Sequence, residues 1–352
     1  EAVLVFCAGG VESFFVFWAP FSTQMDFDNR GLLIGYPAQT VERIITCLDV
    51  TPSVVEEAIA EGADLIVAHH PLIFKKMSRI QPTDEQGQMI YQLIQHNIAV
   101  IAAHTNLDAA RNGVSYEMAR LLNLGEVTFL KANYPLQQKF ELRVDADKAP
   151  QVWRELQSLE AESMKTHAYT GSDAQSHTLL EGFLDSYHLS HLTSLLTEFE
   201  IPQDNLHLIS SKTPTSHIGM GAIGSVPEKN GYPLSVFLEL VADTFNPKAI
   251  KYSGNAEQIH KVAVCGGAGV FLSGEAQKQG AQAFITSDIK YHDFFVEAPE
   301  FVLIDIGHYE SEIPIAKKLK RELEQSFDGI SVDTTSIVTN PVQTFIPQKD
   351  SH

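Results

Sequence analysis

Three things are scarce in this sequence: long apolar runs, basic residues and cysteines. No stretch reaches the roughly 18 consecutive apolar residues that a transmembrane helix requires, so no membrane span is expected. The 25 basic residues are outnumbered by 44 acidic ones, and the formal net charge is −19. A surface of this charge repels phosphate backbones at long range, which argues against a nucleic-acid partner.

The three cysteines, Cys7, Cys47 and Cys265, are odd in number and lack the spacing of a zinc site or a disulfide framework. Cys47 and Cys265 lie in apolar, strand-like runs, so both are predicted to be small buried hydrophobic residues. Reduced cysteines are typical of the cytoplasm, which is therefore the predicted location.

The N-terminal stretch VLVFCAGGVESFFVFWAP is strongly apolar. It has no basic segment before it, and Glu12 interrupts it, so it lacks the pattern of a signal peptide. We expect a buried first helix here, with an irregular apolar pattern.

Strand and helix signals alternate in the first and last thirds of the chain. Thr51 and Pro52, for example, supply an N-cap and a first helical residue directly after an apolar run. Continuously apolar strands that alternate with helices predict an α/β fold, with a parallel-sheet core formed from the N- and C-terminal halves and covered by helices. The predicted strands are 43–50, 64–70, 97–105, 261–267, 282–288 and 301–308, and the last helix is 312–327.

The middle of the chain follows a different order. Residues 135–216 read as strand–helix–strand–strand–helix–strand, which is typical of an inserted ferredoxin-like α+β domain. The predicted domains are therefore 1–134 for the first half of the core, 135–216 for the insert and 217–352 for the second half of the core.

Histidines and carboxylates gather where the predicted core strands end. In α/β sheets the ligand site lies beyond the carboxyl ends of the strands, so this placement predicts one shared site. The residues at or just past such ends are His69, His70, His104, Asp108, Asp288 and His308.

Two pairs of these residues suit metal binding. His308 and Glu312 are four residues apart, which on a helix puts both side chains on one face; the alternative is a helix-surface pair without a ligand. His69 and His70 are adjacent, and on an extended backbone they would point to opposite sides. They serve one metal if the strand bends before Pro71, and two different metals otherwise.

Asp108 follows His104 by four residues and can bridge two metals as a carboxylate. Mixed nitrogen and oxygen ligands suit Zn, Fe, Mn, Co or Ni, and the sequence does not choose among them. Two such ions about 3.5–4 Å apart would generate a nucleophilic hydroxide from water. His104 would then either position another ligand or shuttle protons.

Two further segments contain candidate binding or catalytic residues. In CGGAGVF, residues Gly266, Gly267 and Gly269 can let backbone N–H groups approach an anion at a helix N-terminus; close helix–strand packing is the alternative. In ITSDIKYHD, Asp288 and His292 are candidate general acids or bases.

Together these motifs resemble the Nif-three-like family, also called the type 2 GTP cyclohydrolase-like family. The resemblance implies a dinuclear metal centre with two divalent ions bound by His69, His70, Asp108, His308 and Glu312. It also implies a ring-shaped homohexamer whose sites face an internal cavity, and a PII-like insert. The segments that carry it are DFDNRGLLIG (26–35), ADLIVAHHPLIF (63–74), AAHTNLDAARNGV (102–114), GMGAIG (219–224), VAVCGGAG (262–269), FITSDIKYHD (284–293) and IDIGHYESE (304–312).

Two functions fit these observations. The first is a metal-dependent hydrolase of a nucleotide or another phosphorylated small molecule, with GTP cyclohydrolase chemistry as one specific version. The second is a non-catalytic binding or regulatory protein, in which the insert acts as a sensor or gate.

Overall fold

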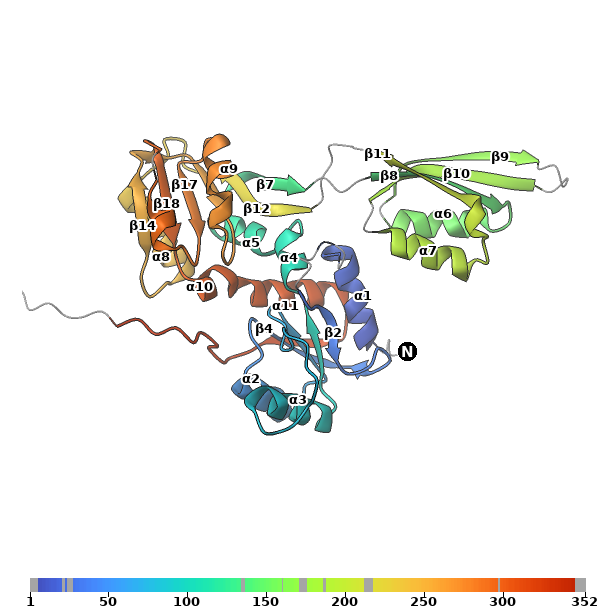
Figure 1. The fold of residues 1–352 in the computed structure, drawn as a ribbon, viewed down its shortest axis with the longest axis horizontal. Helices are drawn as coiled ribbons and strands as arrows, with labels where there is room; N and C mark the ends of the chain where they lie inside the picture. The colour runs from blue at the N-terminus through green and yellow to red at the C-terminus, as the bar shows by residue number, and fades with distance from the viewer. Residues whose placement is uncertain are drawn as a thin grey trace, which may run out of the picture. The chain divides into compact units, whose positions relative to one another are not determined.

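The computed structural model describes residues 6–20, 23, 28–133, 137–159, 161–170, 176–185, 188–211, 218–296 and 298–345. The chain divides into two compact units: unit 1 comprises Glu1–Lys131 and Gly219–His352, and unit 2 comprises Ala132–Ile218 (Figure 1). The boundaries predicted from sequence, 134/135 and 216/217, fall on residues outside the described ranges. None of the described helices is long and apolar enough to cross a membrane.

The first sheet of unit 1 has the strand order β19-β4-β5-β6-β2. Its first four strands run parallel, and β2 pairs antiparallel with β6 at the edge. The strands are β19 (Ser331–Thr334), β4 (Arg43–Cys47), β5 (Leu65–Ala68), β6 (Ala99–Ala102) and β2 (Gly31–Ile34). Strand β19 comes from the end of the chain, so the two halves of the sequence meet within this sheet.

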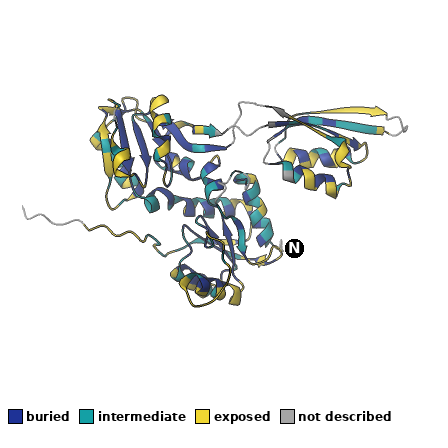
Figure 2. Ribbon diagram, in the orientation of Figure 1, coloured by how far each residue is buried: buried dark blue, intermediate teal, exposed yellow. Residues whose placement is uncertain are grey.

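Side chains of this sheet alternate between two apolar layers because successive residues of a strand face opposite sides. In β5, for example, Leu65 and Val67 join one buried cluster and Ile66 and Ala68 the other. Helices α1 (Ala8–Trp18) and α11 (Pro314–Ser326) cover the first face, and α2 (Pro52–Ala60) and α3 (Glu85–Gln95) cover the second. Figure 2 shows the buried strands between these helices. The buried first helix is thus confirmed over the described residues of α1.

The predicted helix start after the first core strand is also confirmed. The Thr51 hydroxyl accepts a hydrogen bond from the Val54 N–H, and Pro52 is the first residue of α2. Asp84 caps α3 in the same way through the N–H of Gly87. Cys47 and Cys265 are buried free thiols, as predicted. These local signals hold because capping satisfies N–H groups that a helix itself leaves without acceptors.

The second sheet of unit 1 has the order β14-β18-β17-β16-β12-β7. Strands β16, β17 and β18 are parallel, whereas β14 and β12 pair with them antiparallel. Helices α5 (Val114–Leu121) and α8 (Leu234–Phe245) cover one face, and α9 (Ser273–Lys278) lies on the other. The strands are β14 (Lys251–Asn255), β18 (Phe301–Asp305), β17 (Ala283–Thr286), β16 (Lys261–Val264), β12 (Ile218–Ser225) and β7 (Gly125–Asn133).

The predicted parallel-sheet core is therefore confirmed in part: the six strands named from the sequence pair in parallel, but in two mixed sheets rather than in one parallel sheet. Unit 1 has two sheets, and each has a parallel centre with antiparallel strands toward its edges. The α/β class holds. An apolar run indicates that a strand is buried on both faces, but it does not encode the direction of its neighbour, which the length and course of the connections decide.

Unit 2 follows the order β8 (Gln137–Asp145), α6 (Ala149–Ser158), β9 (Glu162–Thr170), β10 (Ser176–Asp185), α7 (Leu189–Glu198) and β11 (Leu206–Ser211). The sheet order is β11-β8-β10-β9, and all its pairs are antiparallel. Its helices share an apolar cluster with one face of the sheet, including Phe140, Val152 and Leu192. Unit 2 thus has a core of its own, with the strand–helix order of a ferredoxin-like domain.

Removing unit 2 should leave unit 1 folded. A Cβ at Gly219 would lie 2.8 Å from the Lys131 carbonyl oxygen, and one at Gly221 would lie 3.2 Å from Leu130, so the end of β7 and the start of β12 are neighbours. A short Gly-Ser hairpin loop in place of residues 134–217 can therefore join them. We expect the shortened chain to keep its helical circular dichroism and to bind metal. An aggregated product, or a folded one that binds none, would contradict the separation of the units.

Candidate metal centre

The candidate ligands stand just beyond three strand ends of unit 1. β5 ends at Ala68, and the N–H groups of His69 and His70 then donate to the carbonyls of Cys47 and Leu48, at 3.2 and 2.9 Å. After β18, helix α10 (His308–Glu312) carries its first and last residues on one face, as the four-residue spacing predicts. The strand-end rule for α/β sheets therefore places these groups correctly.

Asp108 lies on a helix that we did not predict. The strand expected over 97–105 ends at Ala102, and α4 (Thr105–Ala109) begins three residues later. The side chain of Asn106 donates to the Ala19 carbonyl at 2.7 Å and fixes this short helix against the end of α1. Such a five-residue helix is too short to show an apolar period, so only tertiary contacts define it.

The five side chains that the family resemblance implies as ligands come together around one carboxylate. Oε2 of Glu312 lies 3.0 Å from Nε2 of His70, 2.9 Å from Nε2 of His308 and 4.0 Å from Nε2 of His69. Oδ1 of Asp108 lies 3.6 Å from Nε2 of His69. Three sets of potential ligand atoms each lie within 4.8 Å: His69, His70 and His104; His70, His308 and Glu312; and His69, Asp108 and Glu312.

Each histidine of the cluster is held through its other ring nitrogen. Nδ1 of His69 lies 2.8 Å from the Ala103 carbonyl oxygen. Carboxylates hold the other three Nδ1 atoms: Asp49 binds His70 at 2.7 Å, Asp288 binds His308 at 2.6 Å, and Asp28 binds His104 at 2.7 Å. Metal-binding histidines are commonly anchored in this way, because the bond fixes the ring and the tautomer and leaves Nε2 for the metal.

The cluster also contains polar atoms that the protein does not satisfy. Within the described part of the chain, Nε2 of His69 and Oδ1 of Asp108 are buried without a hydrogen-bond partner. Oε2 of Glu312 has close ion-pair contacts with His70 and His308, but neither contact has the geometry of a regular hydrogen bond. His69 is fully buried, and Glu312 is only 3% exposed. Buried polar atoms nearly always have hydrogen-bond partners, so these three atoms, which face one another, fit a bound cation. The nitrogen and oxygen donors suit a divalent transition metal.

The electrostatics of the cluster are uneven. Burial first, and then the charge of Glu312, raise the pKa of Asp108 well above its usual value. Burial opposes ionisation of Glu312, but the bonds from His308 and His70 hold its pKa low. Burial likewise lowers the pKa of His69 to about 3. The carboxylates of Asp49 and Glu312 outweigh burial at His70 and raise its pKa to about 10.

His104 faces the same centre from the side of His69 and His70. Its ring centroid lies 5.4 Å from that of His69 and 5.3 Å from that of His70. Its partner Asp28 also accepts hydrogen bonds from the N–H and the hydroxyl of Thr105. Although burial opposes it, the bonds from His104 and Thr105 lower the pKa of Asp28 to about 2. A charged Asp28 keeps the proton of His104 on Nδ1 and its Nε2 available as an acceptor.

The structure separates the two candidate acids or bases of ITSDIKYHD. Asp288 binds Nδ1 of His308, so it positions a ligand. His292 lies on the exposed 3-10 turn Tyr291–Phe294, and its ring contacts Tyr291 and Phe295. No contact between His292 and the five ligand candidates is found in the described structure. The chain turns at Asp288, whose φ is 54°, and carries His292 outward.

The glycine-rich turn supports the packing alternative. The N–H of Gly267 donates to the Ser311 hydroxyl at 3.0 Å, and that of Gly269 to the Thr286 hydroxyl at 2.9 Å, so neither is available for an anion. A Cβ on Gly266 would lie 2.4 Å from Val114, and one on Gly267 would lie 2.4 Å from Oε1 of Glu312. Gly267 also has a φ of +60°. These glycines let the turn pack against Glu312.

Asp49 and Asp28 are the functional residues that our sequence reasoning missed. A signal existed for both. Asp49 follows a buried strand, just as His69 and His70 do, and Asp28 lies in DFDNRGLLIG, a segment that carries the family resemblance. Which histidine each aspartate would support depends on contacts 21 and 76 residues apart in sequence. No local pattern encodes such pairings.

The fold and the cluster define an α/β protein with a buried His/Asp/Glu group that can hold metal. The sequence matches the Duf34/NIF3 (NGG1p interacting factor 3) family over residues 9–341, and the chain belongs to that family.

Relatives of the chain agree with this assignment. A Staphylococcus aureus protein named "GTP cyclohydrolase 1 type 2 homolog" is 30% identical over 92% of this chain and 96% of its own length. One from Halalkalibacterium halodurans with the same name is 29% identical over 94% and 96%.

Two solved structures share the fold. A Staphylococcus aureus protein has a TM-score of 0.76 at 29% identity and covers 98% of this chain and 100% of its own. A Bacillus cereus protein related to NIF3 has a TM-score of 0.75 at 26% identity and covers 96% and 99%.

Asp49→Asn should weaken metal binding without unfolding the protein. The amide keeps the shape of the side chain but supports the His70 imidazole less well than a carboxylate does. Loss of such a partner typically lowers metal affinity between about 10-fold and 100-fold. A competition titration with a chelating dye measures this affinity. Asp243→Asn, at an exposed position of α8, is the matched control and should change nothing. Unchanged affinity in Asp49→Asn would mean that Asp49 does not support the centre.

Metal binding should release protons at pH 7. His70 and His308, with pKa values raised to about 10 and about 9, carry a proton on each imidazole in the metal-free protein. A metal needs the lone pair of Nε2, so each histidine must lose one proton on binding. The release should fall as pH rises through 9–10, where the metal-free histidines are already neutral. Calorimetry in buffers of different ionisation enthalpy counts the protons. Heats that are equal in all buffers would contradict this account.

Proposed function

We propose that this protein binds two divalent metal ions and is a metal-dependent hydrolase of a phosphorylated small molecule, such as a nucleotide. One observation carries the proposal: five ionisable side chains from both halves of unit 1 converge, and His69, Asp108 and Glu312 among them bring buried atoms without a hydrogen-bond partner close together. Buried polar atoms in proteins nearly always have hydrogen-bond partners, and a bound cation would satisfy these.

Two of the three ligand sets share Glu312. His70, His308 and Glu312 form one group, and His69, Asp108 and Glu312 form another. A carboxylate common to both groups is suited to bridge two ions, because its charge offsets the repulsion between two dications. We therefore propose that Glu312 would hold both ions and that Asp108 would hold one of them. This revises the role that the sequence suggested for Asp108.

The metals, when bound, would supply Lewis acidity and make water nucleophilic at neutral pH. The chain's own contribution is position and proton transfer. Asp49, Asp288 and the Ala103 carbonyl hold three imidazoles in the orientation that points Nε2 inward. The charged Asp28 holds His104 with Nε2 free to accept a proton, so His104 is the proposed general base.

A pocket of about 530 Å3 beside His70 can hold a substrate of moderate size. Its own lining is acidic, with Asp49, Asp84 and Glu85, so the cations that would bind a phosphate group come from the loop that follows His70. The loop that follows His70 carries Lys75, Lys76 and Arg79, all exposed and without an ion pair among the described residues. Phe74 at its start lies 6.2 Å from the His104 ring, measured between centroids. Cations on a loop that starts beside the His104 ring are suited to bind phosphate groups.

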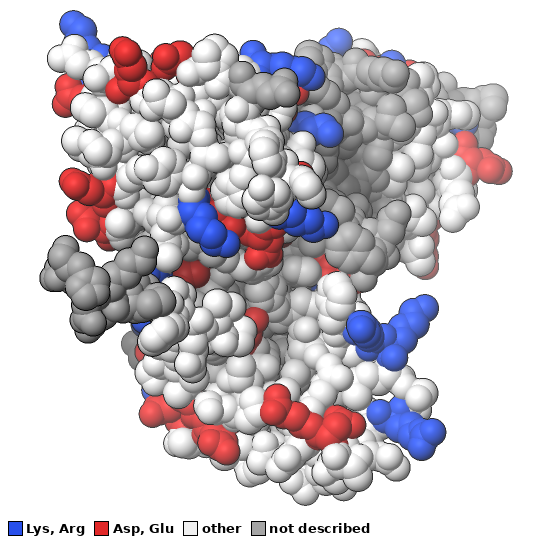
Figure 3. All heavy atoms as spheres, turned by 60° about the vertical axis from the view of Figure 1, so that its left-hand side comes forward, with Lys and Arg blue, Asp and Glu red and all other residues white. Residues whose placement is uncertain are grey.

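The distribution of charge also bears on the partner. On the face drawn in Figure 3, basic side chains lie in small groups, some of them beside acidic side chains, and no continuous basic stripe crosses the face. A small phosphorylated molecule needs only one such group, whereas a nucleic acid needs a continuous basic track. The relatives' printed names suggest GTP as the first nucleotide to test. The homohexamer implied by the family resemblance stays a prediction.

The proposal is tested with metal-loaded protein and a panel of nucleotides and phosphomonoesters. We expect metal-dependent turnover and close to two ions per chain by elemental analysis. Glu312→Gln should lose both ions, because both groups share it, whereas Asp108→Asn should lose mainly one. His104→Ala should keep the metal and lower turnover by about 100-fold, the usual contribution of a general base.

These outcomes separate the parts of the proposal. Binding of a panel compound without turnover would support the regulatory alternative and leave the metal centre intact. Loss of both ions in Asp108→Asn, with one retained in Glu312→Gln, would return the bridging role to Asp108. Less than one ion per chain after incubation with Zn, Mn or Fe would overturn the metal centre itself.

A further inference from the structure

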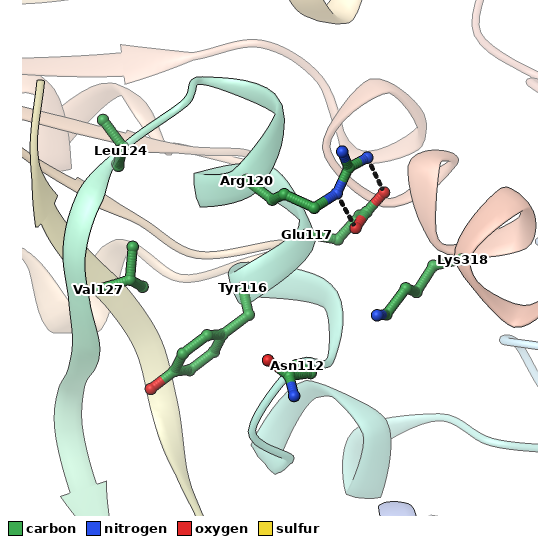
Figure 4. Close-up of a pocket in the computed structure, with 7 residues that line it drawn as sticks. All are labelled: Asn112, Tyr116, Glu117, Arg120, Leu124, Val127 and Lys318. Atoms are coloured by element: carbon green, nitrogen blue, oxygen red, sulfur yellow. Dashed lines mark hydrogen bonds and ion pairs between the residues drawn. The ribbon is translucent and has the colours of Figure 1, made fainter. Parts of the chain in front are cut away.

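A second pocket of unit 1 lies apart from the ligand residues of the metal centre. It has a volume of about 210 Å3, which is small for a ligand site. Helix α5, the start of β7 and helix α11 enclose it (Figure 4). Its lining residues are Asn112, Tyr116, Glu117, Arg120, Leu124, Val127 and Lys318.

The pocket contains an unsatisfied hydroxyl. Within the described structure, the Tyr116 hydroxyl is buried and has no hydrogen-bond partner. The ring itself is fixed, because it meets Phe129 edge to face at 5.0 Å between centroids. A buried donor without a partner is destabilising. A ligand oxygen that accepts from Tyr116 would satisfy it.

Positive charge exceeds negative charge around the pocket. Glu117 accepts hydrogen bonds from Arg120 at 2.7 and 2.8 Å and from Arg321 at 2.6 Å, so one carboxylate neutralises two guanidinium groups only in part. Lys318 is only 14% exposed, pairs with Glu322 and lies over the Trp18 ring. The side chains of Arg120 and Arg321 are 56% and 39% exposed. The three cations thus face two carboxylates, and in a chain of net charge −19 this local excess of positive charge points to an anionic ligand.

The remaining wall of the pocket is apolar. Leu124 and Val127 face it from the start of β7, opposite the polar groups of α5 and α11 (Figure 4). In the same view, Lys318 extends from α11 toward α5 on the side of Asn112. A small ligand with one acidic group and an apolar body would therefore contact the cations through its acidic group and the aliphatic side chains through its apolar body.

The pocket lies between helices α5 and α11, and each follows directly in sequence after a helix that carries candidate metal ligands. Asn112 lies in the turn between α4, which carries Asp108, and α5. Helix α11 begins directly after α10, which carries His308 and Glu312. A ligand held by both α5 and α11 therefore connects the two halves of the core from which the metal ligands come.

We propose that this pocket binds a small organic anion, with its acidic group at Arg120 and Lys318, an oxygen at the Tyr116 hydroxyl and its apolar body on Leu124 and Val127. The acidic group is a carboxylate or a phosphate. The site is independent of the proposed hydrolase activity.

Trp18 offers a direct readout of binding. Nζ of Lys318 lies over the Trp18 ring, 5.9 Å from its centroid. The chain has two tryptophans, so Trp153→Phe leaves Trp18 as the single reporter. Phenyl phosphate and benzoate carry the same apolar body with a phosphate or a carboxylate, and inorganic phosphate lacks that body. We expect a saturable change of Trp18 fluorescence with phenyl phosphate or benzoate, and weaker binding of inorganic phosphate.

Variants locate the binding. By calorimetry, Tyr116→Phe should raise the Kd about tenfold, as loss of one hydrogen bond predicts, and Lys318→Gln at least as much. Lys317→Gln, at the exposed neighbouring position of α11, is the matched control and should bind normally. Binding should persist in Glu312→Gln, which separates this pocket from the metal centre. The proposal would be overturned if no probe bound saturably. It would also be overturned if Tyr116→Phe and Lys318→Gln both bound the probes with the affinity of the unsubstituted protein.

Discussion

The buried carboxylate of Glu312 is the group on which the core of unit 1 depends. A charge with 3% exposure is costly unless opposite charges and hydrogen bonds surround it. Here His70 approaches from the first half of the chain and His308 from the second. The two sheets therefore have to meet where these residues meet. Gly267 is required in the same place, because any side chain would collide with Glu312.

A ring of supporting acceptors makes this centre rigid. Asp49, Asp28, Asp288 and the Ala103 carbonyl each fix one imidazole. The end of the chain adds to this support: the Thr339 hydroxyl donates to Asp49 at 2.8 Å, and Asn340 donates to Glu310 at 3.0 Å. Residues far apart in sequence thus restrict the orientation of the ligand candidates, which is what metal selectivity and catalysis both need.

The small pocket on α5 and α11 uses the same two segments of chain in a different way. Its polar groups are supported by an ion-pair cluster around Glu117, which ties α5 to α11 across 204 residues of sequence. The metal centre and the pocket are therefore two polar sites built on α4–α5 and α10–α11.

Local sequence pattern was enough to place most of the ligand candidates. Apolar runs located the core strands, and the strand-end rule for α/β sheets then put His69, His70 and His308 on one side. The spacing of His308 and Glu312 correctly indicated one helix face. These predictions succeed because burial and helical periodicity determine the spacing of apolar and polar residues within a segment of about ten residues.

Tertiary structure decided the rest. Four features depend on contacts between residues that are distant in sequence: the division into two mixed sheets, the short helix α4, the pairing of Asp28 and Asp49 with histidines, and the packing role of the glycine turn. The sequence alone does not distinguish a glycine that is needed for close packing from one that lets the backbone bind an anion. It also does not distinguish an aspartate that orients a histidine from one that binds a metal. Only distance and burial in the folded chain distinguish them.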